Sequence, residues 1–189
     1  MSPSGSAAPR RRLIGLVGPP GAGKSTMAER LAAADSAAAV LPMDGFHLPQ
    51  DRLRELGRRD RMGAPDTFDV DAFTRVLREL RGRDSVTAPS FDRTIEEPIP
   101  DAITIGRGIR TVYVEGNYLL LWEGIAELLD ETWYLELDPH VRRRRLLERH
   151  VASGKTPDAA AAWIDAVDEP NARLIAASAA RATRTLAVD

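Results

Sequence analysis

The sequence of 189 residues contains no cysteine, and only two of its 26 basic residues are lysines. A chain without cysteine has no disulfide, no thiolate metal site and no cysteine nucleophile. No apolar run approaches the length that a membrane span requires. The 26 basic and 28 acidic residues leave a net charge of -2, so no overall field attracts nucleic acid or an anionic membrane. We therefore expect a cytoplasmic protein with no nucleic acid and no membrane as partner.

One of the two lysines, Lys24, lies in a glycine-rich run with the pattern of a phosphate-binding loop. From Gly18 to Ser25 the run has two glycines five apart, then the lysine, then a hydroxyl. In such a loop the backbone N–H groups surround a polyphosphate, the lysine reaches its outer phosphates and the hydroxyl ligates Mg²⁺. A second match ends at Lys155, but Arg149 stands where its first glycine should be, so we reject it. The predicted nucleotide contacts are Gly18, Pro19, Pro20, Gly21, Ala22, Gly23, Lys24, Ser25 and Thr26.

Short apolar runs alternate with helical patterns along the chain. The apolar runs predict strands at residues 13–17, 38–43, 111–115, 132–137 and 185–188. The helical patterns predict helices at residues 25–34, 70–81, 141–153, 157–167 and 169–182. Strands that are separated by helices form a mostly parallel sheet with both faces covered. We predict an α/β fold of the P-loop NTPase type, a three-layer α/β/α sandwich with a mostly parallel five-stranded sheet.

The length of the chain fits one domain with one core. The first residues are mostly Ser, Pro, Gly and Ala followed by three arginines, so we predict a disordered arm at 1–12 before a single domain at 13–189. Residues 46–100 are too long for a plain connection in a compact domain. We interpret them as an inserted acceptor-binding region, and residues 139–156 as a lid region.

Two carboxylates stand at the ends of predicted strands, on the side of the phosphate-binding loop. Asp44 follows the strand at 38–43, and Glu115 ends the strand at 111–115. Ligands collect at the carboxyl ends of parallel strands, so both acids are expected near the phosphates. Phosphoryl transfer needs a base for the attacking hydroxyl and ligands for Mg²⁺. We assign Asp44 as the base and Glu115, with Ser25, as the metal ligands; the alternative is that the two acids only cap the following turns.

An arginine-rich segment follows the fourth predicted strand. On a helix, Arg142, Arg145 and Arg149 share one face. Arginines on a helix that closes over the nucleotide neutralise the transferring phosphate, and Arg145 and Arg149 are our candidates for this catalytic role, beside Lys24. The alternative is a solvated face, because a run of charges on a helix is usually exposed.

Together these motifs resemble those of the phosphoribulokinase, uridine kinase and bacterial pantothenate kinase family of P-loop kinases, over nearly the whole chain. The stretch 43–47 looks like the Asp-x-Phe motif in which the family's aspartate is the catalytic base. The stretch 61–69 resembles a pantothenate kinase segment, and Glu115 stands in a strand that is similar to the family's strand ending in Glu-Gly. Arg145 and Arg149 match lid arginines. The resemblance implies an enzyme that uses ATP and Mg²⁺ to phosphorylate a small-molecule alcohol.

The predicted acceptor strand departs from the best-known members of that family. Residues 86–93 end in Phe91, Asp92 and Arg93, where pantothenate kinases have Tyr-Ser-His and uridine kinases have Tyr-Asp. Asp92 and the short chain favour a nucleoside acceptor, as in uridine kinase. The alternatives are a fructose-type sugar, a pantothenate-like acceptor or, in a different class, a regulatory ATPase or switch. The predicted acceptor contacts are Asp44, His47, Phe91, Arg93, Tyr118 and Asn171.

Several of these acceptor contacts also have a purely structural interpretation. His47 fits either a contact with the acceptor or a surface turn. Arg93 fits either a polar acceptor contact or a surface ion pair with Glu96 or Glu97. We expect His150 to face solvent and the three tryptophans to serve packing, and we leave a homodimer open.

Overall fold

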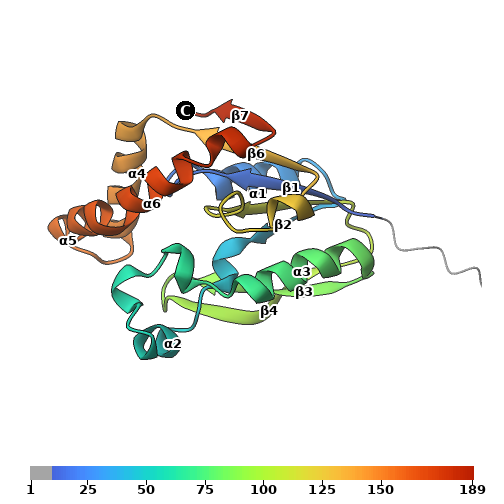
Figure 1. Ribbon diagram of the computed structural model, residues 1–189, viewed down its shortest axis with the longest axis horizontal. Coiled ribbons are helices and arrows are strands. Elements are labelled where there is room, and N and C mark those ends of the chain that lie inside the picture. Colours follow the sequence, from blue (N-terminus) through green and yellow to red (C-terminus); the bar gives the residue numbers. More distant parts are fainter. Residues whose placement is uncertain (1–9) are drawn as a thin grey trace, which may run out of the picture.

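The fold is built on one parallel sheet (Figure 1). The structure is a computed structural model that describes residues 10–189, so residues 1–9 of the predicted arm lie outside it. The sheet order is β2 (Ala38–Pro42), β5 (Thr111–Gly116), β1 (Arg12–Val17), β6 (Glu131–Glu136) and β7 (Arg184–Ala187). All neighbouring strands are parallel. The predicted five-stranded sheet is confirmed, and every predicted strand boundary lies within one residue of the observed one.

Both faces of the sheet are covered, because the side chains of β1 alternate between two apolar layers. Leu13 belongs to the layer under α3 (Val70–Gly82), whereas Leu16 packs with Ala28 of α1 (Lys24–Ala33). Successive side chains of a strand point to opposite faces, so a wholly apolar strand is stable only when both faces are buried. The predicted three-layer arrangement is confirmed.

The connection between β2 and β5 carries the inserted region. Its elements are η1 (Met43–Phe46), α2 (Gln50–Glu55), η2 (Arg59–Arg61), η3 (Pro65–Thr67), α3, β3 (Val86–Asp92) and β4 (Glu97–Ile105). β3 and β4 form an antiparallel hairpin. The insertion therefore extends beyond the predicted end at residue 100. The sequence did not indicate β4, because two prolines and two acids interrupt its apolar pattern.

Arg11 joins the sheet to the inserted region. The residue is only 2% exposed. Its guanidinium donates hydrogen bonds of 2.6–3.0 Å to the carbonyl oxygens of Leu80, Arg83, Asp84 and Gly106. These carbonyls stand at the end of α3 and just after β4, and a buried cation is stable only with such partners. The predicted disordered arm of 1–12 is therefore too long, because Arg11 and Arg12 are part of the folded domain.

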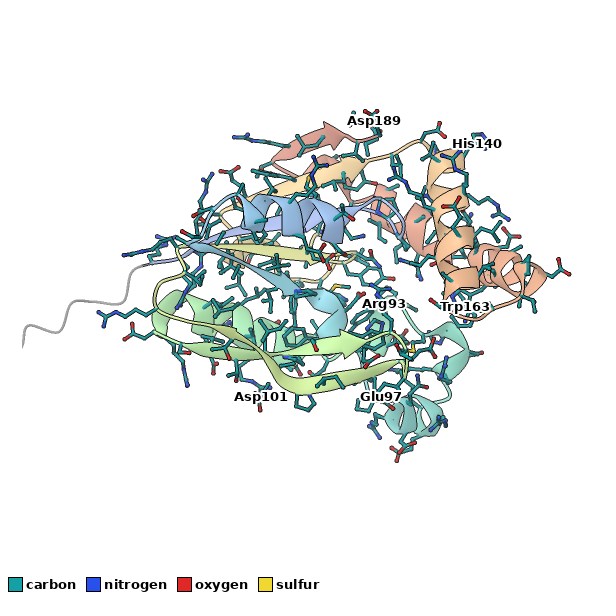
Figure 2. The ribbon with its side chains drawn as sticks, turned by 180° about the vertical axis from the view of Figure 1, so that it is seen from behind. Arg93, Glu97, Asp101, His140, Trp163 and Asp189 are labelled. Carbon is teal, nitrogen blue, oxygen red and sulfur yellow. The ribbon has the colours of Figure 1, made fainter. Side chains whose placement is uncertain are left out.

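The C-terminal helices lie beside the carboxyl ends of the strands (Figure 1). They are α4 (Pro139–Ala152), α5 (Pro157–Trp163), the π-helix η5 (Ile164–Asp168), α6 (Glu169–Ala176) and the short η6 (Ala179–Arg181). Asp138 caps α4 and Thr156 caps α5 through their side-chain oxygens. In Figure 2, His140 and Trp163 mark opposite ends of this group, and Trp163 lies on the side of the hairpin turn at Arg93. Within residues 10–189, no helix is long and apolar enough to cross a membrane.

Candidate active site

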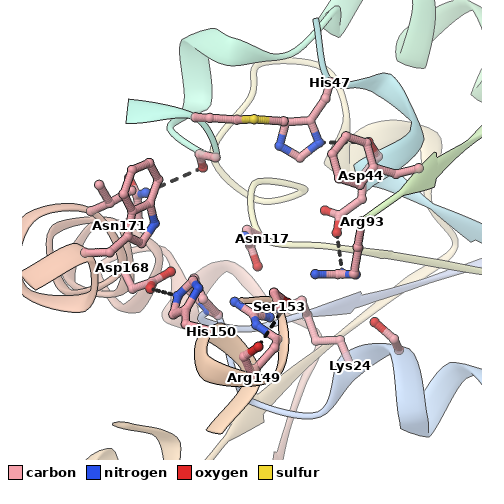
Figure 3. A pocket seen from close by; sticks show the side chains of 18 of the residues that line it. Lys24, Asp44, His47, Arg93, Asn117, Arg149, His150, Ser153, Asp168 and Asn171 are labelled. Atoms are coloured by element: carbon pink, nitrogen blue, oxygen red, sulfur yellow. Dashed lines mark hydrogen bonds and ion pairs between the residues drawn. The ribbon is translucent and has the colours of Figure 1, made fainter. Parts of the chain in front are cut away.

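A cavity of about 380 Å³ opens at the carboxyl ends of β1, β2 and β5 (Figure 3). The loop after β1, the inserted region and the C-terminal helices all contribute to its lining. The predicted residues that line it are Pro20, Gly21, Gly23, Lys24, Ser25, Thr26, Asp44, His47, Phe91, Arg93, Glu115, Arg145, Arg149 and Asn171. The other predicted contacts, Gly18, Pro19, Ala22 and Tyr118, lie outside the lining. The sequence thus located the cavity, but not every residue at its surface.

The loop between β1 and α1 has a backbone that requires glycine. Gly21 and Gly23 have φ values of 84° and 87°, a region that side chains disfavour. A Cβ at Gly18 would come within 2.9 Å of a backbone oxygen of β6. Lys24 Nζ donates to the Pro19 carbonyl at 3.1 Å and so closes the loop. Gly18 and Pro19 therefore shape the loop, while the N-terminus of α1 presents its N–H groups to the cavity as an anion site.

Lys24 lies at the bottom of the cavity, 8% exposed. Burial lowers the pKa of Lys24 to about 8, although the nearby Glu115 and Asp44 raise it. Burial disfavours a charged amine, and a negative ligand beside it favours the charged form again. Binding of a polyphosphate therefore stabilises the charged form of Lys24.

Ser25 and Glu115 stand next to each other beside Lys24. Ser25 Oγ donates to Glu115 Oε1 at 3.0 Å. Burial, followed by the charge of Asp44, raises the pKa of Glu115 to about 6. One carboxylate and one hydroxyl are hard oxygen ligands, and Mg²⁺ commonly takes one or two protein oxygens together with phosphates and waters. The pair fits Mg²⁺ on that ground. Within residues 10–189, no group of three or more His, Cys, Asp or Glu side chains is placed to hold a metal ion.

Asp44 lies across the cavity floor from the loop, in η1 directly after β2. Its Oδ2 accepts a hydrogen bond from Arg93 Nη2 at 2.7 Å. Burial acts to raise the pKa of Asp44, but the nearby His47, Arg93 and Lys24 outweigh it and hold that pKa below its usual value. Asp44 is therefore an ionised carboxylate beside the phosphate-binding loop. Arg93 makes neither of the ion pairs with Glu96 or Glu97 that the sequence left open.

His47 forms an aromatic wall of the cavity. Its ring packs at a tilt against Phe68 and Phe91, with centroid distances of 3.9 Å and 4.7 Å. Its Nδ1 lies 2.8 Å from the carbonyl oxygen of Asp44, which can only accept, so Nδ1 carries the proton. Burial lowers the pKa of His47, although the Asp44 carboxylate raises it. His47 is therefore neutral at pH 7 and offers Nε2 as a hydrogen-bond acceptor.

The position of Tyr118 differs from its predicted place in an acceptor wall. Its ring is fully buried against Phe68 and Trp122, and its hydroxyl donates to the Gly63 carbonyl at 2.5 Å. Tyr118 therefore supports the cavity edge through Gly63 instead of forming its surface. Asn171 does line the cavity, and its amide lies 3.5 Å from the same carbonyl.

The arginines of α4 divide between the cavity and the fold. Arg142 is buried and pairs with Glu169 at 2.6 Å, so it joins α4 to α6. Arg145 lines the cavity and donates to the Asp189 carbonyl at 2.6 Å. The guanidinium of Arg149 lines the cavity and has no ion pair within residues 10–189. Arg145 and Arg149 are thus the two arginines of this run that face the cavity, as the sequence indicated.

Part of the cavity wall could not be predicted from the sequence. His150, expected to face solvent, lines the cavity and pairs with Asp168 at 2.8 Å. Trp163, assigned to packing, also lines it, with Lys155 Nζ 5.0 Å from its ring centroid. Asn117, next to Tyr118, is a further lining residue. Asp168 is the last residue of a π-helix, and the shift of the helical face in this π-helix cannot be predicted from regular spacing.

Comparisons with known proteins agree with this geometry. An ATP-dependent kinase-like protein of Aspergillus versicolor is 42% identical over 133 residues, which span 64% of this chain and 77% of that protein. A candidate uridine kinase of Schizosaccharomyces pombe is 37% identical and matches 77% of this chain and 68% of its own length. No family model matches the chain.

The solved structures give the same picture over almost the whole chain. A candidate fructose transport system kinase from Silicibacter sp. TM1040 superposes with a TM-score of 0.88 and is 38% identical, covering 98% of this chain and 93% of that one. Its cover includes the inserted region and the C-terminal helices as well as the sheet. The chain therefore belongs to the phosphoribulokinase, uridine kinase and pantothenate kinase family of P-loop kinases, and it is a phosphotransferase that uses ATP.

Proposed function

We propose that the protein transfers the γ-phosphate of ATP to an alcohol group of a small metabolite, with a nucleoside as the leading acceptor. The observation that carries this proposal is the position of Asp44. It is an ionised carboxylate that shares one cavity with Lys24 and the phosphate-binding loop. A protein that only hydrolyses ATP has no need for an acceptor cavity with a base in it.

The residues divide the reaction among them. The N–H groups of the loop and Lys24 bind the β- and γ-phosphates, and Arg149 neutralises charge on the transferring group. Asp44 accepts the proton of the acceptor hydroxyl, while the oxygen of that hydroxyl forms the new bond to phosphorus. The bond between the γ-phosphorus and the bridging oxygen breaks, and ADP leaves. Ser25 and Glu115 would hold Mg²⁺, which supplies neutralisation of the phosphate charge when bound.

Arg93 has a specific part in this scheme. Its ion pair with Asp44 fixes the carboxylate and leaves Oδ1 without a hydrogen bond from Arg93. The acceptor hydroxyl can therefore reach Oδ1 while Arg93 keeps the carboxylate ionised. Arg93 thus serves as a positioning residue for the base.

The aromatic wall supports a ring-shaped acceptor. His47 and Phe91, whose rings are tilted by 37° against each other, both line the cavity with Asp44, and a nucleobase or a sugar ring can pack against them. Uridine is therefore the first acceptor to test. A fructose-type sugar is the second, because the Silicibacter protein, described as a candidate fructose transport system kinase, is similar over the whole chain.

The test is ADP release from Mg-ATP in the presence of nucleosides, sugars, pantothenate and phosphosugars. We expect one class of hydroxylated acceptor to raise the rate well above the ATP-only background. ATP turnover that no acceptor changes would instead assign the protein to the regulatory ATPases.

A further inference from the structure

A second pair of polar side chains faces the cavity from the wall opposite Asp44. His150 Nε2 and Asp168 Oδ2 are 2.8 Å apart, and their side chains are 13% and 9% exposed. Figure 3 shows this pair and Asn171 on the side of the C-terminal helices, with Asp44 and Arg93 on the other side. The scheme for phosphate transfer uses neither His150 nor Asp168.

The backbone that carries Asp168 is irregular. Residues Ile164–Asp168 form a π-helix between two α-helices. Such turns are rare and occur frequently at functional sites, because the extra residue changes the face on which later side chains lie. Val167 and Asp168 line the cavity, whereas Asp165 on the same turn is exposed and pairs with Arg143.

Asp168 has an oxygen without a partner. Within residues 10–189, its hydrogen bond to His150 uses Oδ2, and no hydrogen bond reaches Oδ1. Asp168 lines the cavity, and Oδ1 is not among the fully buried atoms that lack a partner, so this oxygen is open to a ligand in the cavity. An ionised carboxylate only accepts, so the group that completes it is an O–H or N–H donor.

The surroundings of Asp168 define what carries this donor. Trp163 and Val167 stand beside it in the lining and offer an apolar surface to a carbon skeleton. The cavity of about 380 Å³ must hold the phosphates of the donor as well, so the acceptor is small. Such a molecule places one hydroxyl at Asp44 and its remaining hydroxyls toward the opposite wall.

We propose that Asp168 binds a second hydroxyl group of the acceptor, remote from the hydroxyl that becomes phosphorylated. This inference rests on the proposed kinase function and restricts its acceptor to a class. The acceptor has at least two hydroxyls on a small ring, as a nucleoside or a sugar has, and alcohols with one hydroxyl are poor substrates. His150 acts through Asp168 as a positioning residue that fixes the carboxylate in the wall.

The test compares Asp168→Asn with the matched control Asp165→Asn on the same π-helix. The probes are uridine and D-fructose. Each is paired with an analogue that keeps the ring and one primary hydroxyl, 2′,3′-dideoxyuridine for uridine and tetrahydrofurfuryl alcohol for fructose. On the wild type we expect a KM for the active probe that is at least about tenfold below that of its analogue, since a hydrogen bond to a charged group has this effect.

In Asp168→Asn the KM of the active probe should rise about tenfold, while the KM values of its analogue and of ATP and the kcat stay within about twofold. His150→Gln should show a smaller rise with the same pattern, and Asp165→Asn should behave as the wild type. An equal KM for probe and analogue on the wild type overturns the inference. So does a rise that is the same for both, or a lower melting temperature with all constants changed together, which assigns the pair to structure alone.

Failure of the proposed function has a different signature, namely ATP turnover that no alcohol changes. In that case calorimetric titration of uridine and of D-fructose into the complex with a non-hydrolysable ATP analogue still tests Asp168. Binding by the wild type that Asp168→Asn weakens about tenfold supports the inference. Binding that Asp168→Asn leaves unchanged, or no binding of either probe by the wild type, overturns it.

Discussion

The donor side of the cavity and the acceptor side that we propose are built in different ways. The donor side is centred on one continuous segment, residues 18–26, in which backbone geometry and one lysine create the anion site. The acceptor side collects single side chains from η1, the β3–β4 turn and the C-terminal helices. Nucleotide binding is thus encoded by local spacing. The choice of acceptor depends on how distant segments pack together.

Two residues hold these sides together away from the cavity. Arg11, directly before β1, bonds the carbonyls at the end of α3 and after β4. Asp130 Oδ2 accepts from the Leu13 N–H at 2.7 Å and from Arg81 Nη1 at 2.8 Å, which links β1 to α3. Substitutions in one side should therefore change activity, whereas substitutions of Arg11 or Asp130 should change stability.

The largest effect should come from Asp44→Asn, because this substitution should impair transfer to the acceptor but leave ATP binding nearly unchanged. Loss of the base should lower kcat about 10³-fold, because general base catalysis commonly contributes 10²–10⁴-fold. ATP affinity should stay within about threefold, since the base acts on the acceptor hydroxyl. Acceptor-dependent ADP release and calorimetric ATP binding check this. Asp51→Asn at an exposed position is the control, and normal turnover by Asp44→Asn would remove Asp44 from the mechanism.

Arg11→Met should weaken the contact of the chain before β1 with the end of α3 and the residue after β4. The substitution removes a buried guanidinium and leaves several carbonyls without donors, which lowers the free energy of unfolding by about 3 kcal/mol. Urea unfolding measures this loss, with Arg10→Met, whose side chain is 78% exposed, as the control. Hydrogen exchange should accelerate in α3 and β4 before α1. Equal acceleration throughout would show that Arg11 stabilises the domain as one unit.

Arg149→Lys tests whether Arg149, our candidate lid arginine, acts by charge alone. Lysine keeps the charge but loses the planar fork that binds a phosphate through two hydrogen bonds, so kcat should fall about tenfold. Arg144→Lys, on the exposed face of α4, is the matched control. A variant that keeps the wild-type kcat would reduce Arg149 to a general electrostatic contribution.

The smallest effect concerns the pH dependence of stability at Asp130, which links β1 to α3. Burial raises the pKa of Asp130, but hydrogen bonds from the Leu13 N–H and Arg81 outweigh it and hold the pKa below its ordinary value of 3.8. Because the folded-state pKa is the lower one, the stabilisation is present above about pH 5 and disappears as the pH falls through the folded-state pKa. Melting temperatures between pH 3 and pH 6 should fall more steeply for the wild type than for Asp130→Asn. Parallel curves would contradict this assignment.

The sequence predicted those features that depend on local pattern. The strands, the loop around Lys24 and the strand-end acids Asp44 and Glu115 follow from apolar periodicity and glycine spacing, which act within a few residues. The positions of Tyr118 and His150 could not be derived in this way. A buried aromatic and an acceptor wall have the same sequence pattern, and the π-helix that ends at Asp168 shifts the face on which Asp168, the partner of His150, lies.

The most direct test of the shared cavity is the mass balance of one reaction with Mg-ATP and the acceptor found in the screen. Phosphorus NMR and mass spectrometry would count ADP, phosphorylated acceptor and free phosphate over time. Transfer within one cavity predicts one phosphorylated acceptor for each ADP and no accumulation of free phosphate. ADP and free phosphate in equal amounts, with no phosphorylated acceptor, would contradict it.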